Sequence, residues 1–268
     1  MSRVIAITNQ KGGVGKTTTA VNLAASLAAA EQRTLLIDAD PQGNATSGLG
    51  VTPEEITHTT YDVLLDLCPV SEAIRRGVHF GKLDLMPATP DLAGAEVELV
   101  GVEGREHQMR KAIAELRPLY DFILIDCPPS LGLITINMLT AADGALIPLQ
   151  CEYFALEGIS HLLKTIDLIQ KGLNPQLVID GVLLTMYDAR LNLSRQVAAD
   201  TRAYFGDKVF NAVVPRNVRL AEAPSFGKPI ISYDIASVGS STYLSLAKEV
   251  IGRAQTHVSS GPPLAHPA

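Results

Sequence analysis

Two lysines, three glycines and two threonines lie between residues 11 and 18, in the order Lys-Gly-Gly-Val-Gly-Lys-Thr-Thr. Glycines permit backbone conformations in which consecutive N–H groups point at one anion. An ammonium group and a hydroxyl at the end of such a loop suit a chain of phosphates and its Mg²⁺ ion. The sequence therefore predicts a loop that binds nucleotide phosphates, formed by Lys11, Gly12, Gly13, Val14, Gly15, Lys16, Thr17 and Thr18.

The polar side chains of this loop can be given separate roles. We expect Lys16 to reach the β- and γ-phosphates and the Thr17 hydroxyl to bind Mg²⁺. Lys11 lies five residues before Lys16, and two neighbouring ammonium groups repel each other unless phosphate charge compensates both. The alternative is a glycine-rich turn with surface lysines.

The segments around the loop favour the phosphate-binding interpretation. A short apolar run, residues 4–7, precedes the loop, and a helix-like run, residues 19–30, follows it. Strand, glycine loop and helix is the context that a phosphate-binding loop requires. The helix also directs its positive dipole end at the bound anion.

A second apolar run, residues 35–37, ends in Asp38, and Asp40 follows two residues later. A carboxylate at the end of such a strand can hold a metal-bound water or orient the water that attacks a phosphate. An aspartate that caps a helix or turn fits Pro41 and Gly43 equally well. The residues alone leave both interpretations open.

A third apolar run, residues 122–125, ends in Asp126 and is followed by Cys-Pro-Pro. This is a Walker B pattern, in which Asp126 binds the Mg²⁺ shell through water. An apolar run ending in an acid is common in α/β proteins, so this pattern alone is a weak signal. The phosphate-binding loop that begins at residue 11 is what supports the Walker B interpretation. Residues 128–132 would then form the segment that senses the γ-phosphate.

Short β-branched runs alternate with helical patterns along the chain, which predicts an α/β fold with a single-domain, doubly wound, mostly parallel sheet. Ligands of such sheets bind at the carboxyl ends of the strands. We expect a domain over residues 1–254 and a flexible tail over 255–268. The expected strands are 4–8, 34–38, 83–87, 122–126, 144–149, 178–186 and 209–214. The expected helices are 16–30, 60–67, 105–116, 132–142, 157–171, 193–204 and 243–254.

Composition limits the protein class. No run approaches eighteen apolar residues, and the start of the chain lacks a signal-peptide pattern, so we expect a cytoplasmic protein. The three cysteines form no CxxC pair and are expected to be reduced. The net charge is −6, but residues 38–103 carry twelve acids and three bases, whereas residues 186–230 carry seven bases and four acids. Local charge of this kind steers a polyanion more than the total does.

The loop and the Asp-x-Asp-Pro-Gln-Gly-Asn stretch together resemble a known family. Residue 10, where the common P-loop has its first glycine, is Gln10, and the extra Lys11 makes the loop similar to the deviant Walker A motif. The stretch at 38–44 resembles switch I of the ParA group. From about residue 3 to 253 the chain resembles ParA/Soj chromosome-partitioning ATPases of the short form, without an N-terminal helix-turn-helix.

The resemblance implies roles that the residues alone do not. Lys11 contacts the nucleotide of a partner subunit, Asp40 takes part in hydrolysis beside the metal, and Lys11, Lys16 and Asp40 form the catalytic set. The metal set is Thr17, Asp126 and Asp40. Two further segments, residues 186–194 and 214–229, match the family. They imply that Met186, Pro215 and Asn217 lie by the adenine. They also imply contacts to DNA phosphates, for which Arg190 and Arg219 are the main candidates and Arg195, Arg216 and Lys228 are further candidates.

The implied function is a DNA-tethered switch. ATP/ADP and Mg²⁺ are its cofactors, and its partners are a second subunit in an ATP-dependent homodimer, non-specific double-stranded DNA and a ParB/Spo0J-type partner protein that stimulates hydrolysis. The cycle would segregate a chromosome or plasmid from a nucleoid-associated position, without a membrane. One alternative is a MinD-like membrane-cycling ATPase, which needs a basic amphipathic C-terminal helix. The tail has three prolines and no lysine. Another alternative is a small-molecule enzyme of the same fold, for which the basic block at 216–228 has no role.

Overall fold

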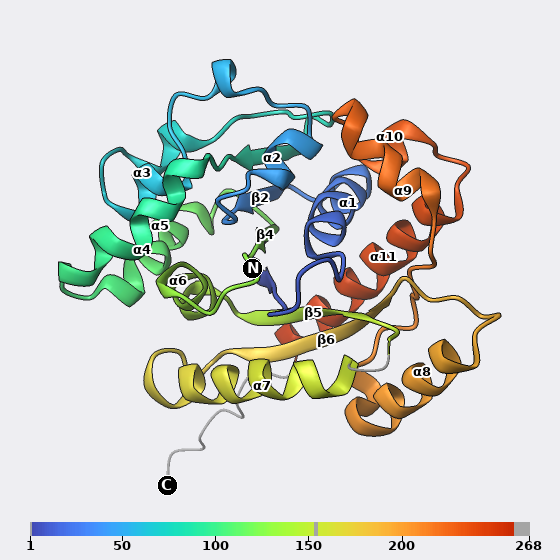
Figure 1. Cartoon of the computed structure of the whole chain (residues 1–268). Coiled ribbons are helices and arrows are strands. Elements are labelled where there is room, and N and C mark those ends of the chain that lie inside the picture. The colour runs from blue at the N-terminus through green and yellow to red at the C-terminus, as the bar shows by residue number, and fades with distance from the viewer. Residues whose placement is uncertain (1, 153–154, 260–268) are drawn as a thin grey trace, which may run out of the picture.

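Six strands form one sheet in the computed structural model, which describes residues 2–152 and 155–259 (Figure 1). The strand order is β3-β2-β4-β1-β5-β6, and every neighbouring pair is parallel. The predicted α/β, doubly wound fold class is confirmed. The strands are β1 Arg3–Ile7, β2 Thr34–Asp38, β3 Leu83–Met86, β4 Phe122–Asp126, β5 Gly144–Gln150 and β6 Val178–Thr185.

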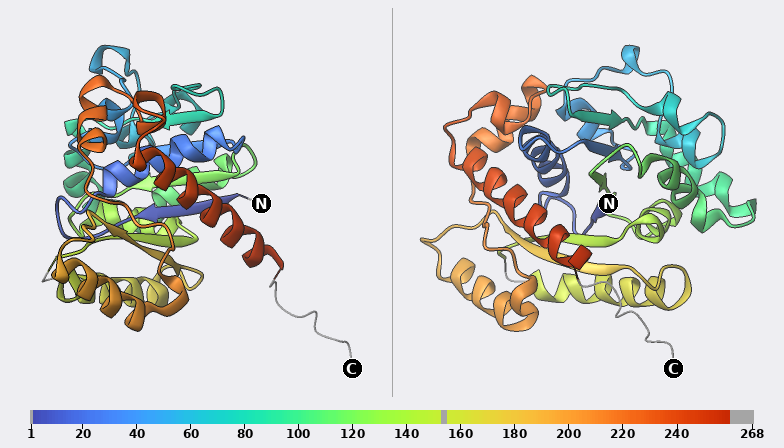
Figure 2. Two further views of the ribbon diagram at one scale, coloured as in Figure 1. Left: turned by 90° about the vertical axis from the view of Figure 1, so that its right-hand side faces the viewer. Right: turned by 180° about the vertical axis from the view of Figure 1, so that it is seen from behind.

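Helices cover both faces of this sheet (Figures 1 and 2). The α-helices are α1 Lys16–Ala29, α2 Asn44–Gly48, α3 Thr60–Leu64, α4 Ala95–Glu98, α5 Gln108–Leu116, α6 Leu133–Ala141, α7 Ala155–Gly172, α8 Asn192–Phe205, α9 Val218–Glu222, α10 Ile230–Tyr233 and α11 Val238–Ser259. Short 3-10 helices occupy Pro53–Glu55, Val70–Ala73, Pro90–Gly94, Leu99–Gly101, Arg105–His107, Gly206–Lys208 and Ala223–Phe226.

The strand order fixes where a ligand can bind. From the central β1 the chain passes first to β2, which lies beyond β4, and later to β5 on the other side of β1. The crevice at this change of direction lies outside the carboxyl ends of the strands. The loop after β1 begins there, and Asp38 of β2 pairs in register with Asp126 of β4 at the same edge.

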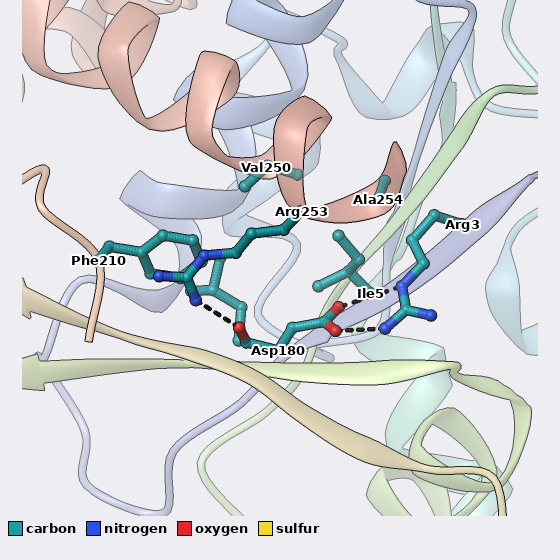
Figure 3. Close-up of a pocket in the computed structure, with 8 residues that line it drawn as sticks. Arg3, Ile5, Asp180, Phe210, Val250, Arg253 and Ala254 are labelled. Atoms are coloured by element: carbon teal, nitrogen blue, oxygen red, sulfur yellow. Dashed lines mark hydrogen bonds and ion pairs between the residues drawn. The ribbon is translucent and has the colours of Figure 1, made fainter. Parts of the chain in front are cut away.

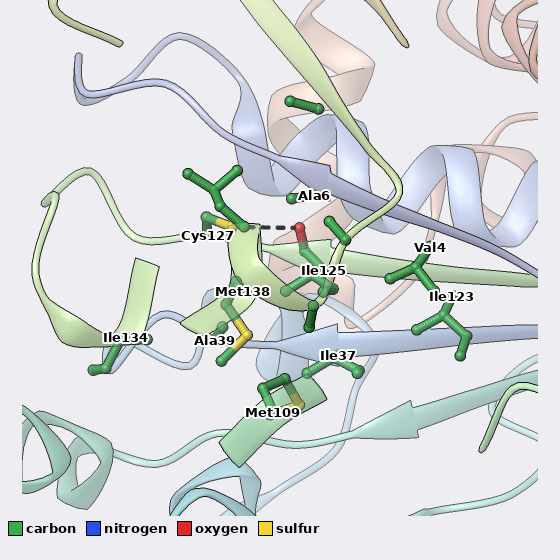
Figure 4. Packing of buried hydrophobic residues seen from close by; sticks show 14 of the residues in the cluster. Val4, Ala6, Ile37, Ala39, Met109, Ile123, Ile125, Cys127, Ile134 and Met138 are labelled. Atoms are coloured by element: carbon green, nitrogen blue, oxygen red, sulfur yellow. Dashed lines mark hydrogen bonds between the residues drawn. The ribbon is translucent and has the colours of Figure 1, made fainter. Parts of the chain in front are cut away.

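Successive side chains of each strand point to opposite faces of the sheet, so the interior consists of two layers. In β4, Phe122 and Leu124 face the layer that contains α1 and α11, whereas Ile123 and Ile125 face the layer that contains α5 and α6. Figure 4 shows the second layer, where methionines of α5 and α6 pack against the strands, with Met109 and Met138 near Ile37 and Ala39. Because both faces are covered, the strands read as continuous apolar runs in the sequence.

Contacts of Arg253 hold the C-terminal helix α11 against β6, away from the carboxyl ends of the strands (Figure 3). The Arg253 guanidinium lies 4.0 Å from the centre of the Phe210 ring, and its Nη1 donates to the Asp180 carbonyl oxygen at 2.7 Å. The Asp180 carboxylate accepts hydrogen bonds from Arg3 of β1. These contacts join α11, β6 and the start of β1, while α11 also packs along α1.

The seventh expected strand, 209–214, is wrong. Among the described residues, this segment forms isolated bridges and no strand ladder, at Val182–Val209 and, just after its end, at Tyr187–Pro215. The reason lies in the middle of the segment, where the N–H groups of Asn211 and Ala212 donate to the Glu249 carboxylate of α11, at 2.9 and 2.7 Å. Those donors point at a helix, so no continuous ladder forms.

Several helix boundaries also differ from expectation, and two helices show this most clearly. The helix expected over 60–67 ends at Leu64, since Asp66 has a φ of +57°, which right-handed helix excludes. The helix expected to end at residue 254 continues to Ser259, because no glycine or proline occurs between residues 254 and 259. It also starts earlier, at Val238, where the Ser237 hydroxyl accepts the Ser240 N–H. Residues 260–268 of the expected tail lie outside the described residues.

Candidate active site

The loop after β1 is held to the sheet by two side chains. Asn9 is buried, its Oδ1 accepts the Lys11 N–H at 3.0 Å, and its Nδ2 donates to the Pro148 carbonyl of β5 at 2.7 Å. Near the other end of the loop, the Thr185 hydroxyl of β6 donates to the Val14 carbonyl at 2.9 Å. The glycine-rich segment is therefore shaped by the protein itself.

Beyond Lys11, the backbone donors of this loop have no hydrogen-bond partner among the described residues. None of the N–H groups from residue 12 to residue 18 donates to an atom of the described residues. Gly13 and Gly15 have φ values of +74° and +90°, and Gly15 opens α1 without a side-chain cap. A row of free donors at a helix N-terminus is an anion site. The loop therefore fits a chain of phosphates.

Lys16 lies inside this site. Its relative exposure is 7%, and its Nζ donates to the Lys11 carbonyl at 3.1 Å. Burial lowers the pKa of Lys16 below its ordinary value, and the charges of Asp126, Cys127 and Asp40 partly oppose that shift. A buried ammonium with so little compensation is stabilised by any phosphate that enters the loop.

Lys11 points away from its own loop. Its half-exposed Nζ lies 3.1 Å from an Oε2 of Glu152, just after β5. The other oxygen of Glu152 lies 3.6 Å from Nη2 of Arg216. One carboxylate thus contacts both the lysine expected to cross to a partner and an arginine expected to meet DNA.

Two fully buried carboxylates end β2 and β4 side by side. Burial raises the pKa of Asp38 to about 6, against hydrogen bonds from Thr46. Burial, and then the charge of Asp38, raise the pKa of Asp126 well above its ordinary range. Both Asp126 carboxylate oxygens lack a hydrogen-bond partner among the described residues. An unpartnered buried carboxylate beside a phosphate loop fits a divalent cation.

Thr17 and Asp40 complete the neighbourhood of that carboxylate. The Thr17 side chain lies near Asp126 and opposes the rise in the pKa of Asp126, although the two groups are not within full hydrogen-bond geometry. Asp40 is nearly buried, accepts the Gln42 N–H at 3.0 Å and donates its own N–H to Asp38 at 3.2 Å. No cluster of three His, Cys, Asp or Glu ligands occurs in the part of the chain that is described. This arrangement suits Mg²⁺, which keeps several waters and takes one or two carboxylates plus phosphates.

A cavity of about 420 Å³ adjoins the loop. Gly15 and Thr18 of the loop line it together with Met186, Pro215 and Asn217. The structure thus brings together the phosphate loop and all three residues expected near the adenine. Its remaining lining is mostly apolar, as a base pocket requires, and comprises Thr185, Val214, Arg216, Val218, Leu220, Ala221 and Tyr243.

Of the basic residues, Arg216 lines this cavity, Arg219 lies in α9 and Arg195 lies in α8, while Arg190 precedes α8 and Lys228 precedes α10. These three helices lie on the right-hand side of Figure 1. The side chain of Arg190 is 89% exposed and donates two hydrogen bonds to Asp188, which also accepts the Arg190 N–H, and these bonds lower the pKa of that carboxyl to about 2. Arg219 pairs with Glu222 at 3.0 Å. Arg195 and Lys228 form no ion pair with the described residues.

The sequence did not single out three residues that the structure places at the site. Thr185 and Tyr243 come from distant parts of the chain, and no local pattern marks them. Glu152 also follows an apolar strand, but Gln150 and Cys151 separate it from the apolar run, whereas Asp126 follows its run directly. The apolar run that ends in Asp38 is recognisable in the sequence, but the resemblance assigns the role in hydrolysis to Asp40 alone.

Two further observations bear on the alternatives. Cys68, Cys127 and Cys151 are free, and the latter two are buried. Burial raises the pKa of the Cys151 thiol to about 11, which suits a packed thiol better than a reactive one. Across residues 2–152 and 155–259, no helix has both the length and the apolar character to cross a membrane.

Comparison with known proteins gives consistent relatives. A family model described as an AAA domain matches residues 2–179. Chromosome partitioning protein ParA of Myxococcus xanthus is 58% identical over 253 residues, which cover 94% of this chain and 89% of that protein. Sporulation initiation inhibitor protein Soj of Bacillus subtilis is 58% identical over 250 residues, which cover 93% and 98%. The solved structure of cobyrinic acid a,c-diamide synthase from Mycobacterium smegmatis, with bound ADP and magnesium, has a TM-score of 0.83 at 38% identity and covers 98% of this chain and 97% of that one.

Proposed function

The chain belongs to the AAA domain family and, within it, to the ParA/Soj chromosome-partitioning ATPases, and we propose that it is an ATP-dependent dimer switch that binds DNA without sequence preference. The observation that carries the proposal is the shared cavity, in which the segment with Arg216 and Asn217 forms one wall and Gly15 and Thr18 form another. Nucleotide in this cavity touches the segment that carries the basic residues.

ATP and Mg²⁺ are the cofactors. The free N–H groups of residues 12–18 receive the phosphates, Lys16 lies against the β- and γ-phosphates, and Met186, Pro215 and Asn217 surround the adenine. Thr17, Asp126 and Asp40 would hold the metal. Bound Mg²⁺ supplies charge neutralisation on the β- and γ-phosphates during hydrolysis.

Asp40 orients the attacking water. Asp40 lies in the segment between Asp38 and Thr46. The Asp38 carboxylate holds the two ends of this segment together, because it accepts the N–H and the hydroxyl of Thr46, at 2.8 and 2.7 Å. A carboxylate held in this way contributes by position, since a preorganised group costs no rearrangement during the reaction.

Lys11 makes the dimer depend on ATP. Its ammonium is half exposed and turned to Glu152 rather than into its own loop, so it can reach phosphates of a second subunit. Each subunit then brings Arg190, Arg219, Arg195, Arg216 and Lys228 to a composite surface. Because several of these charges are paired at the surface, one subunit alone neutralises few phosphates.

A ParB-type partner stimulates hydrolysis and releases the dimer from DNA, by ordering the site or by supplying a cation as activating arginines do. Repeated release and rebinding, in the cytoplasm and on the nucleoid, segregates a chromosome or plasmid. Membership of the ParA/Soj family supports this role for a partner.

A small-molecule enzyme of the same fold is the second candidate, since the diamide synthase is 38% identical to this chain. The named partitioning relatives are more similar, at 58% identity. The basic segments around Arg190 and Arg219 also have no role in a small-molecule reaction.

The test is binding to a random-sequence DNA duplex, with and without ATP–Mg²⁺, across a series of salt concentrations. We expect binding that requires ATP and weakens steeply with salt. Absence of binding in every nucleotide state would reject the DNA-tethered switch and favour the small-molecule candidate.

A further inference from the structure

We propose that Thr185 is a positioning residue for the phosphates, because its hydroxyl fixes the orientation of the peptide between Val14 and Gly15. Thr185 ends β6, and its relative exposure is 2%. Its Oγ1 donates to the Val14 carbonyl at 2.9 Å, across 171 residues of sequence. The inference rests on the proposed function only in that the loop binds ATP.

The direction of that hydrogen bond decides where the next donor points. The chain has no cis peptide bond among the described residues, and in a trans peptide the C=O and the following N–H point in opposite directions. Holding the Val14 oxygen toward β6 therefore turns the Gly15 N–H away from β6. That N–H is one of the free donors of the loop.

Gly15 makes this orientation easy to lose. Its φ of +90° lies in the region that glycine enters without strain, and glycine also leaves that region at little cost. Without an outside contact, the Val14–Gly15 peptide could rotate and present its carbonyl oxygen to the phosphates. A carbonyl oxygen facing phosphate would repel it.

Thr185 is suited to hold the peptide. A β-branched residue in a strand has a restricted χ1, so the hydroxyl has a defined direction. The strand itself is held by pairing of Gln150 with Thr185, and the Thr185 carbonyl accepts the Cys151 N–H at 3.2 Å. Val14 is buried, so no water replaces the hydrogen bond if the hydroxyl is removed.

Thr185 acts together with Asn9, which orients the other end of the loop through the Lys11 N–H. The two anchors come from β6 and from the end of β1. Thr185 also lines the cavity next to Met186, so the same strand end contacts both the base region and the phosphate loop. A variant must therefore be tested separately on phosphate and on base.

The experiment compares Thr185→Val, which keeps the shape and removes the hydroxyl, with Thr185→Ser, which keeps the hydroxyl. The matched control is Thr201→Val, since Thr201 is fully buried and its hydroxyl also donates to a carbonyl, that of Val197 at 2.7 Å, within α8. Calorimetry measures the affinity for ATP–Mg²⁺ and for tripolyphosphate–Mg²⁺, which has no base. Thermal unfolding is measured in parallel.

We expect Thr185→Val to lower the affinity for both ligands by about tenfold, which is the effect of losing one hydrogen bond and leaving its partner unsatisfied. Thr185→Ser should stay within about threefold of the wild type, and Thr201→Val should leave both affinities unchanged. Loss of ATP affinity with unchanged tripolyphosphate affinity would assign Thr185 to the base and overturn the inference. Equal effects of Thr185→Val and Thr185→Ser, or of Thr185→Val and Thr201→Val, would also overturn it. A wild type that binds ATP but never DNA would reject the proposed function and leave this inference standing.

Discussion

Nζ of Lys11 lies 3.1 Å from the Glu152 carboxylate of the same subunit. Both side chains are 41% exposed, and the second oxygen of Glu152 lies 3.6 Å from Arg216. In the proposed dimer Lys11 contacts phosphates across the interface, so the pair with Glu152 must break before that contact forms. An exposed pair of this kind contributes about 1 kcal/mol or less, which is small enough to be exchanged for a phosphate.

Replacing Glu152 by Gln should favour the dimer. The change removes the charge that holds Lys11 while keeping the shape, so ATP-dependent self-association should tighten several-fold, up to about fivefold for 1 kcal/mol. Sedimentation velocity with ATP–Mg²⁺ measures the effect. The matched control is Glu31→Gln, which breaks a surface pair with Lys82 away from the site. Equal self-association of Glu152→Gln and wild type would contradict the prediction.

Replacing Lys16 by Met should abolish nucleotide binding without destabilising the free protein. Burial lowers the pKa of Lys16 in the fold. A lysine whose folded pKa is depressed is charged more readily in the unfolded chain, so at neutral pH its burial costs stability. We expect ATP affinity to fall by at least about a hundredfold, because charge-assisted contacts to phosphate are lost. The unfolding temperature without nucleotide should stay equal or rise, and a large fall would refute this account.

Replacing Asp40 by Ala should separate binding from hydrolysis. The carboxylate contacts the Gln42 N–H and not the phosphate loop, so ATP affinity should remain within a few-fold of wild type. Phosphate release should fall by about 10²–10⁴, the contribution of a positioned acid–base group. The variant should therefore remain on DNA as an ATP-bound dimer. Normal hydrolysis by this variant would show that Asp40 does not orient the water.

Replacing Arg219 by Ala should weaken DNA binding uniformly across sequences and reduce the slope of log affinity against log salt by about one. Arg219 is exposed and forms ion pairs with Glu222 and Asp234. Arg33→Ala is the matched control, since Arg33 is an equally exposed arginine paired with Asp121 and lies away from the basic segments. An identical salt slope for Arg219→Ala and Arg33→Ala would remove Arg219 from the DNA surface.

Replacing Arg253 by Ala should destabilise the fold without touching the site. The change removes the stack on Phe210 and the hydrogen bonds to the carbonyl oxygens of Asp180 and Asp207. We expect a loss of about 2–3 kcal/mol in the free energy of unfolding, from a partly buried cation–π contact and charged hydrogen bonds. Arg253→Lys should recover only part of this loss, because an ammonium cannot make both contacts. ATP affinity of either variant, measured well below its unfolding temperature, should match the wild type.

The sequence by itself determined the repeating strand–helix order and the phosphate loop. Residues 34–38 and 122–126 were predicted with their observed bounds, because a buried parallel strand is apolar throughout and ends sharply at a charged residue. The loop at 11–18 was recognised as a phosphate-binding loop in the same way, since few other structures have glycine, lysine and threonine at that spacing. These signals are local, so no distant residue was needed to recognise them.

Only the tertiary structure decided which distant residues meet the loop. The strand expected over 209–214 failed because Glu249, far along the chain, takes its backbone donors. Thr185 reaches Val14, and Glu152 reaches Lys11 and Arg216, through strand order that no local pattern encodes. A hydrogen bond or ion pair between distant segments depends on which strands become neighbours. In this chain, packing of two covered faces settles that order, and the sequence near each residue does not.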